Sequence, residues 1–313
     1  MRALLCLAAL SCLLTAAAEA APARLLNDHP LNGSLWDTRS GQPTTEDALF
    51  SAAAAADWVL IGEKHDNGEH HRLQARIVAA LGRRGRRMAV VWEMAEPEHA
   101  GALAAARLED VGSLEAALAW KARGWPDWDE YQPIAEAALA ARMPMLPGKP
   151  SPSQVRALAR GEDLAPDTAE LLSRSRRYPP AVQSDLLEEL AASHCGRLPE
   201  AALAPMAEVQ RFWDASMADA LRQATQPPHD AEGAILIAGS GHVREDRAVP
   251  WHLEGESLTV ALVEVVAGRQ TAADYPAFDP RLFDFVWFTP RVDDKDPCAA
   301  FSEERGPEEP VPD

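Results

Sequence analysis

Five short segments of this chain are almost entirely apolar and rich in valine, isoleucine and aromatic residues. Segments of this length and composition are typical of β-strands, and their unbroken apolar character indicates strands that are buried on both faces. Sheets of that kind are mostly parallel and are covered by helices on both sides, which constrains the chain to an α/β architecture. The five segments are 58–61, 88–92, 234–238, 258–266 and 283–288.

The first two of these segments are separated by a helical pattern. Leu73, Ile77 and Leu81 repeat at the spacing of one helix face. Just before them, the sequence "DNGE" has the form of a capping box, in which Asp66 caps the helix and Glu69 reaches back to it. Strand, helix and strand in this order predict a βαβ unit with a right-handed crossover.

Between the second and third strands the pattern becomes helical. Alanine- and leucine-rich stretches are interrupted by proline and glycine, and helices are expected at about 128–142, 181–193 and 200–224. We therefore predict an α/β fold: a mostly parallel sheet flanked by helices, with a mainly helical inserted subdomain at about 99–230. Apolar residues make up 47% of the chain, which is ample for the buried core that this fold requires.

The two ends of the chain differ from this pattern. Residues 1–20 carry an arginine, an apolar run and small residues before Ala21, as a signal peptide does, so the protein is expected to be exported. Cys12 is a candidate for a lipid anchor, although Ala9 stands where such sites prefer leucine. Residues 299–313 are acidic and proline-rich and are expected to be disordered, which leaves 21–298 as the folded domain.

Cysteine usage and net charge restrict the chain further. Removal of residues 1–20 would leave only Cys195 and Cys298, and a pair of cysteines in an exported protein predicts a disulfide; two buried thiols are the alternative. The formal charge of −18 argues against nucleic acid as a partner, because phosphate binding requires a basic surface.

Polar side chains stand where three of the predicted strands end. "VLIGEKH" and "ILIAGSGH" each end a strand with Gly-x-x-His, which places Glu63 and His65 after the first strand and His242 after the third. Glu93 follows the second strand. Because the carboxyl ends of parallel strands form the ligand-binding edge of such sheets, we expect these side chains to lie close together.

Three interpretations of this set are open. His65, Glu93 and His242 offer the nitrogen and oxygen ligands that zinc, manganese or iron(II) bind. Without a metal, a histidine held by a carboxylate can act as a general base. The third interpretation is structural, with strand-end polar groups that are satisfied by helix caps and backbone.

Histidines and aromatic residues nearby are further candidates. His70 and His71 begin the helix after the first strand, and His70 shares the face of Leu73 and Ile77, so it is either a packed histidine or a group near the sheet edge. "GWPDWDEYQP" gathers Trp125, Trp128 and Tyr131, which either pack on the sheet or stack on a planar ligand.

Several longer motifs follow one another in a recognisable order. They are "VLIGEKHDNGEHHRLQ", "VVWEM", "GWPDWDEYQPI", "SHCG", Gln210 with "DASMADAL" at 214–221, "IAGSGHVR", "VPWHL", and "FVWFTPR" followed by "DPC", and they extend from about residue 56 to residue 298. In this combination the chain resembles the ChaN-like family of haem-binding uptake proteins, part of the wider Tiki/TraB and erythromycin-esterase-like superfamily. "MLPGKPSP", after residue 142, departs from the "AANxPR"-like stretch that the family has there.

The resemblance implies an exported, often lipid-anchored protein of the periplasm or outer membrane that binds haem during iron uptake. Some family members hold haem as a cofacial pair at a dimer interface, so the implied partners are haem, a second copy of the chain and an outer-membrane haem receptor. Haem iron takes an axial His, Met, Cys or Tyr, and Tyr131 lies within a family-like motif, so it is the preferred ligand, with His70 and His71 as further cofactor contacts.

The wider superfamily implies an alternative function. In its Tiki branch the two Gly-x-x-His motifs and the intervening glutamate mark a metal-dependent protease, and in its esterase branch they activate water. The alternative is thus a hydrolase in which His65, Glu93 and His242 bind a divalent metal, or act without one, and Glu63 is the general base. The polar sheet edge and an aromatic haem groove are expected to be different places. A third hypothesis is an interaction protein whose strand-end polar groups are vestigial.

Overall fold

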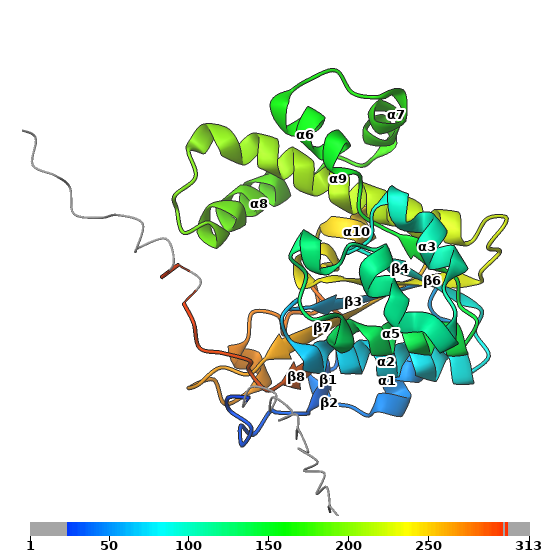
Figure 1. Ribbon diagram of the computed structural model, residues 1–313. Helices are drawn as coiled ribbons and strands as arrows, with labels where there is room; N and C mark the ends of the chain where they lie inside the picture. The colour runs from blue at the N-terminus through cyan, green and yellow to red at the C-terminus, as the bar shows by residue number, and fades with distance from the viewer. Residues whose placement is uncertain (1–23, 297, 300–313) are drawn as a thin grey trace, which may run out of the picture.

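The chain forms an eight-stranded sheet with helices on both faces in the computed structural model, which describes residues 24–296 and 298–299 (Figure 1). The predicted signal peptide and all but the first residue of the predicted tail lie outside the described residues. No helix within the described part of the chain is long and apolar enough to cross a membrane.

The sheet has the strand order β2-β1-β8-β7-β3-β6-β4-β5. Neighbouring strands from β8 to β5 in this order run parallel, whereas β1 pairs antiparallel with both β8 and β2. The mostly parallel α/β architecture is therefore confirmed. The strands are β1 (Leu35–Asp37), β2 (Gln42–Pro43), β3 (Trp58–Glu63), β4 (Met88–Trp92), β5 (Met145–Pro147), β6 (Gly233–Gly239), β7 (Ser257–Glu264) and β8 (Phe285–Thr289).

Helices α1, α2 and α5 cover one face of the sheet, and α9 and α10 cover the other (Figure 1). Ile77 of α2 and Ile134 of α5 are buried in the first layer, and Met217 and Leu221 of α9 in the second. The helices are α1 (Glu46–Ala55), α2 (Gly68–Arg83), α3 (Ala100–Ala105), α4 (Leu114–Ala117), α5 (Trp128–Ala140), α6 (Pro152–Arg160), α7 (Pro166–Arg174), α8 (Pro180–Ser193), α9 (Glu200–Ala224) and α10 (Ala248–Trp251).

The start of α2 differs from the prediction. Asn67, not Asp66, caps the helix, and its side chain accepts a hydrogen bond of 2.9 Å from the backbone N–H of Glu69. The Glu69 side chain does not reach back to the cap but pairs with Arg24 and Arg72. The predicted capping box is wrong because the helix begins one residue later, at Gly68, and basic side chains compete for the glutamate.

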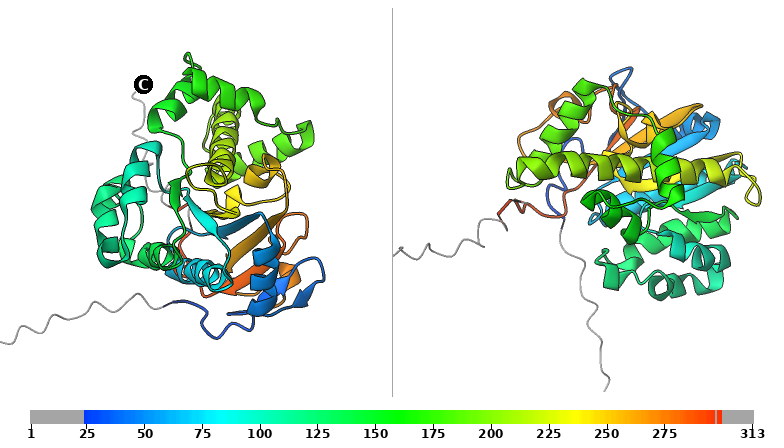
Figure 2. Two further views of the ribbon diagram at one scale, coloured as in Figure 1. Left: turned by 90° about the vertical axis from the view of Figure 1, so that its right-hand side faces the viewer. Right: turned by 90° about the horizontal axis from the view of Figure 1, so that it is seen from above.

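Three helices, α6, α7 and α8, stand away from the sheet and pack on α9 (Figures 1 and 2). We call them the outer helices. The region predicted as a helical insertion, 99–230, contains them, but it also contains β5, which belongs to the sheet, and α5, which packs on α2. The rest of the folded chain, with the C-terminal half of α9, is called the body.

A disulfide ties the outer helices to the C-terminal segment. Cys195, directly after α8, is bonded to Cys298 with an Sγ–Sγ distance of 2.00 Å. The pairing predicted from the cysteine count is therefore present in the structure.

Candidate functional site

The carboxyl edge of the sheet brings together the four predicted strand-end residues. Glu63 is the last residue of β3, Glu93 directly follows β4, and His242 lies in a short 3-10 helix after β6. His65 Nδ1 is 2.8 Å from Glu63 Oε1, and its Nε2 is 3.8 Å from Glu93 Oε1. His242 Nε2 approaches the same Glu93 oxygen to 3.5 Å. The expectation that these side chains lie close together agrees with the geometry.

The glycines of the two Gly-x-x-His motifs make this close approach sterically feasible. A Cβ on Gly62 would lie 2.5 Å from Val243 Cγ2 and 2.9 Å from Ser240 Cα. A Cβ on Gly239 would lie 3.2 Å from His65 Nε2, and the backbone N–H of Gly239 donates a 2.7 Å hydrogen bond to Glu93 Oε2. The motif therefore reflects two strand ends that pack against each other where the polar side chains meet.

A fifth side chain, Asp214 of α9, completes the set; it begins a family-like motif in the sequence but was not predicted to have a role in the site. Its Oδ1 is 2.6 Å from His242 Nδ1, and its Oδ2 accepts a hydrogen bond from the Tyr178 hydroxyl at 3.2 Å. This contact makes Nδ1 the protonated nitrogen of neutral His242 and leaves Nε2 facing Glu93. We call Glu63, His65, Glu93, Asp214 and His242 the acid–base cluster. Asp214 sits among the apolar residues of α9, so helical spacing alone gave no signal for it.

Tyr131 lies behind this cluster and not in a separate groove. Its hydroxyl donates a 2.5 Å hydrogen bond to Glu63 Oε1, and its ring is fully buried. The His71 ring lies 3.7 Å from the Tyr131 ring, centroid to centroid, and His71 Nε2 is 3.4 Å from Glu63 Oε2. Helix α5 packs on α2 at this point, so the predicted haem ligand and the predicted catalytic carboxylate share one hydrogen bond.

His70 is part of the scaffold. Its Nδ1 accepts a hydrogen bond from the backbone N–H of Lys64 at 2.9 Å, and its Nε2 is 2.9 Å from Thr289 Oγ1. Burial holds the pKa of His70 well below its ordinary value, so the ring is neutral. Burial also lowers the pKa of His71, against the opposing charge of Glu63. The cofactor role of His70 and His71 stays a prediction.

The charged side chains of the acid–base cluster shift one another's pKa values. Burial alone would lower the pKa of His242, but the charges of Glu93 and Asp214 outweigh it and raise that pKa to about 9. Burial would raise the pKa of Glu93, yet the charges of His242 and His65 and the N–H of Gly239 bring it below its usual value. For His65, burial lowers the pKa, but Glu63 and Glu93 raise it overall. At neutral pH His242 is therefore protonated between the carboxylates of Glu93 and Asp214.

Two tryptophans and a lysine form the rim of the cluster. Trp125 lies with its ring centroid 5.1 Å from that of His65, and Trp213 of α9 lies 5.9 Å from that of His242. Lys149, from the segment after β5, extends between them, with Nζ 5.2 Å from the Trp125 ring and 4.5 Å from the Trp213 ring. Trp125 thus contacts the site, which sequence reasoning could not separate from ordinary packing.

The comparisons with known proteins agree with these motifs. The family described as "Haem-binding uptake, Tiki superfamily, ChaN" matches residues 49–253 of the chain. The chain belongs to this family. No curated protein matches the chain.

One solved structure shares the fold of this ChaN-family chain, and two others are less similar to it. ChaN of Campylobacter jejuni, whose structure is described as showing cofacial haem binding, is similar with a TM-score of 0.63 and 21% identity over 81% of this chain and 95% of that one. The type III effector HopBA1 gives a TM-score of 0.43 and 18% identity over 78% of this chain and 92% of that one. A mutant of the erythromycin esterase EreC in its open conformation gives a TM-score of 0.45 and 12% identity over 78% of this chain and 93% of that one.

The ChaN-family chain has an apolar cavity of about 810 Å³ beside the cluster. It lies between α6, α8 and α9, and we call it the apolar groove. Gln210 and Trp213 end it on the side of His242, since Gln210 Nε2 is 3.1 Å from His242 Nδ1. Its lining residues are Val155, Ala159, Leu190, His194, Pro199, Ala201, Ala202, Pro205, Met206, Val209, Gln210 and Trp213.

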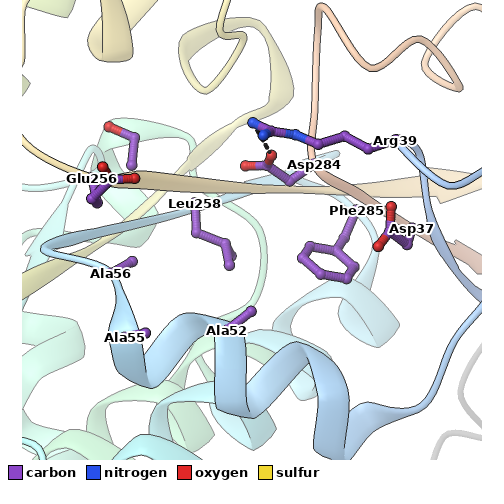
Figure 3. A pocket seen from close by; sticks show the side chains of 10 residues that line it. Asp37, Arg39, Ala52, Ala55, Ala56, Glu256, Leu258, Asp284 and Phe285 are labelled. Carbon is purple, nitrogen blue, oxygen red and sulfur yellow. Dashed lines mark ion pairs between the residues drawn. The ribbon is translucent and has the colours of Figure 1, made fainter.

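A smaller cavity, of about 310 Å³, lies at the opposite, amino-terminal end of the strands (Figure 3). Arg39 and Asp284 form an ion pair of 2.9 Å on its wall, and Phe285 and Leu258 form part of its floor. None of the predicted site residues lines it.

Metal binding has no support in the geometry. Among residues 24–296 and 298–299, no group of three or more His, Cys, Asp or Glu side chains is arranged to hold a metal ion. His65, Glu93 and His242 do meet, but through pairwise contacts of 3.5 to 3.8 Å that are typical of ion pairs between protein groups.

Proposed function

We propose that this protein binds haem and acts in its uptake or relay. The observation that carries the proposal is the apolar groove of about 810 Å³ in a chain of the haem-binding ChaN family. A porphyrin requires apolar walls together with an iron ligand of the His, Met, Cys or Tyr type. The groove is lined by aliphatic side chains from three helices and includes two such ligand types, His194 and Met206.

His194 has the hydrogen bonding of an iron ligand. Its Nδ1 is 2.8 Å from the carbonyl oxygen of Leu190, which accepts the Nδ1 proton. That contact fixes the tautomer in which Nε2 carries a lone pair, the arrangement commonly found for metal-bound histidines. Within the described residues, no hydrogen bond occupies Nε2. When bound, haem would supply an iron centre that takes this axial ligand, and the chain supplies the walls and the orientation.

Tyr131, His70 and His71 remain alternative haem contacts, as predicted from the family motif. None of them lines the apolar groove, and Tyr131 would have to give up its hydrogen bond to Glu63 to bind iron. The pKa of Tyr131 is raised above its usual value by burial and by the charge of Glu63, which disfavours the phenolate that iron(III) prefers. His194 is therefore our preferred ligand.

The cellular setting belongs to the same proposal. We place the protein in the periplasm or at the outer membrane, from the signal-peptide pattern of residues 1–20, with a lipid anchor at Cys12 as an option. A second copy of the chain and an outer-membrane haem receptor are the proposed partners. The disulfide between Cys195 and Cys298 supports an oxidising compartment.

A haemin titration followed at the Soret band tests this function. Wild-type protein is expected to bind saturably with a shifted Soret band, and His194→Ala to lose the shifted band or to bind at least about 10-fold more weakly. Tyr131→Phe is expected to leave the spectrum unchanged. A linear rise in absorbance, as for free haemin, would refute haem binding, and a spectral change confined to Tyr131→Phe would reassign the ligand.

A hydrolase is the second candidate, favoured by the 2.6 Å contact between Asp214 and His242. A carboxylate that orients a histidine, beside a second carboxylate–histidine pair, is the arrangement that general acid–base catalysis uses. Glu63 or His65 would accept a proton from water in this reaction. Hydrolysis of a panel of aryl esters and peptides by wild type, Glu63→Gln and His242→Ala provides the test. Catalysis is expected to fall by at least about 100-fold in each variant; equal rates in all three would exclude the cluster.

A further inference from the structure

Lys149 is a partly buried cation that lies against two tryptophan rings. Its ammonium group lies 4.5 Å from the Trp213 ring and 5.2 Å from the Trp125 ring, so two indole faces hold it from either side. Such cation–π contacts stabilise a charge that has been partly removed from water. The flanking residues Gly148 and Pro150 are buried, which fixes the backbone from which Lys149 extends.

No acidic side chain in the described part of the chain forms an ion pair with Lys149. Glu93 is the nearest source of attraction and raises the pKa of Lys149, although burial, the larger influence, lowers it. The two oxygens of Glu93 are already used, since Oε2 accepts from the N–H of Gly239 and Oε1 faces His65 and His242. Lys149 is thus a positioned cation without an anion of its own.

The position of Lys149 connects it with the apolar groove. Trp213 lines the groove, holds Lys149 through its ring face and lies beside His242. Lys149 does not line the groove itself but lines a second cavity of about 500 Å³, so a ligand in the groove reaches the ammonium group by extending past Trp213. The path runs from an apolar surface to a cation, which matches a ligand with an apolar body and a negatively charged end.

We propose that Lys149, held between Trp125 and Trp213, binds the carboxylate of the ligand whose apolar body occupies the groove. This inference rests on the proposed function, and in haem the carboxylate is a propionate. Another apolar acid with a long hydrocarbon body offers the same chemistry. A charge-assisted hydrogen bond from Lys149 Nζ to a carboxylate oxygen selects ligands that carry this group over esters that lack the charge.

The test compares haemin with its dimethyl ester, in which both propionates are blocked, by titration of the full mature chain. Wild type is expected to bind haemin at least about 10-fold more tightly than the ester. Lys149→Met retains the length and apolar stem of the side chain, so it should weaken haemin binding by about 10-fold and leave ester binding within about 2-fold. Lys149→Arg should restore most of the preference, and the exposed Lys121→Met serves as the matched control.

The outcomes separate the two proposals. Haemin binding without preference over the ester, or unchanged by Lys149→Met, overturns the role of Lys149 and leaves haem binding intact. Absence of haemin binding by wild type removes the haem function. In that case palmitate binding to wild type and Lys149→Met is measured by quenching of tryptophan fluorescence. Palmitate binding that is lost in Lys149→Met supports a carboxylate site for an apolar acid. If wild type does not bind palmitate, or if Lys149→Met binds it equally well, the carboxylate site is overturned. Near-UV circular dichroism of each variant confirms that the indole packing is retained.

Discussion

The body and the outer helices are built on different principles. Every residue of β3 and β4 is buried, and the two helical layers enclose the sheet. In contrast, the outer helices bury few residues. Helix α7 has one buried residue, Thr168, helix α8 has one, Leu186, and none of the nine residues of α6 is buried. The body encloses its own core, whereas the outer helices turn apolar surface toward the groove.

Helix α9 shows this difference within one element. From Arg211 onward most of its residues are buried against the sheet, whereas Ala207 is the buried residue before that point. Pro205 lies inside the helix on the groove side. Because burial of apolar area is the main source of stability, the first half of α9 and the outer helices should open at a lower free energy than the body.

The largest expected effect contrasts a core residue of each region. Ile237 of β6 is fully buried, and Ile237→Ala is expected to lower the free energy of unfolding by about 3 to 4 kcal/mol through lost burial and a residual cavity. Leu187 of α8 is half-buried, so Leu187→Ala should cost under about 1 kcal/mol. Urea unfolding measures both. Equal losses would mean that the two regions are packed alike.

The disulfide gives the next largest effect. It closes a loop of sequence separation 103, and its removal in Cys298→Ser should destabilise the structure by about 2 to 4 kcal/mol through the entropy of the opened loop. Because Cys195 lies two residues after the end of α8, amide hydrogen exchange should accelerate in α8 and at the start of α9, and remain slow in β3 and β6. Faster exchange throughout the sheet would show that the two regions unfold as one unit.

Ligand binding should stabilise the outer helices and the first half of α9, which are expected to be less stable than the body. At a free haemin concentration of 100 times Kd, binding stabilises the bound state by about 2.7 kcal/mol. We expect exchange to slow in α6, α8 and the first half of α9, which line the groove, with the amides of β4 unaffected. Uniform protection, or protection around Tyr131 alone, would place the ligand elsewhere.

The smallest expected effect is a pH dependence located in the body. Burial and a hydrogen bond with Asp284 raise the pKa of Glu245 to about 7, against an ordinary value near 4.5. The folded state therefore keeps a proton that the unfolded state releases. This stabilisation is complete below about pH 4.5 and is lost as the pH rises through about 7, by about 1 to 2 kcal/mol after allowance for solvent screening.

The variant Glu245→Gln lacks this titration and therefore serves as the comparison for wild type. The raised pKa of His242 also makes stability fall, between about pH 6.5 and 9. The difference between the wild-type and Glu245→Gln profiles, measured by urea unfolding from pH 4 to 8, isolates the carboxyl pair. Parallel profiles would show that Glu245 is not protonated in the folded protein.

Much of the sheet could be predicted from sequence because burial on both faces leaves an unambiguous apolar run. Segment 88–92 coincides with β4, and the predicted helix at 200–224 coincides with α9. Strands β1, β2 and β5 are only two or three residues long, too short to show a pattern, and they form through pairing with neighbours. Local sequence therefore sufficed where an element is long and wholly buried.

The candidate site was predictable only in part. Glu63, His65, Glu93 and His242 could be found because parallel strands end at one edge, a rule that needs no knowledge of tertiary contacts. No comparable rule places Asp214 and Lys149 at the site. Asp214 lies within a helix among apolar residues, and Lys149 contacts tryptophans that lie 24 and 64 positions away in the chain. Tyr131 was expected apart from the cluster because the docking of α5 on α2 is a tertiary event.

Helix α9 is continuous from Glu200 to Ala224 and contributes to both the apolar groove and the acid–base cluster. Its first turns form one wall of the groove, and its middle carries Trp213 and Asp214, which contact Lys149 and His242. The groove and the sheet edge therefore have one helix as a common wall, and a substitution that displaces α9 near Trp213 is expected to disturb both places at once.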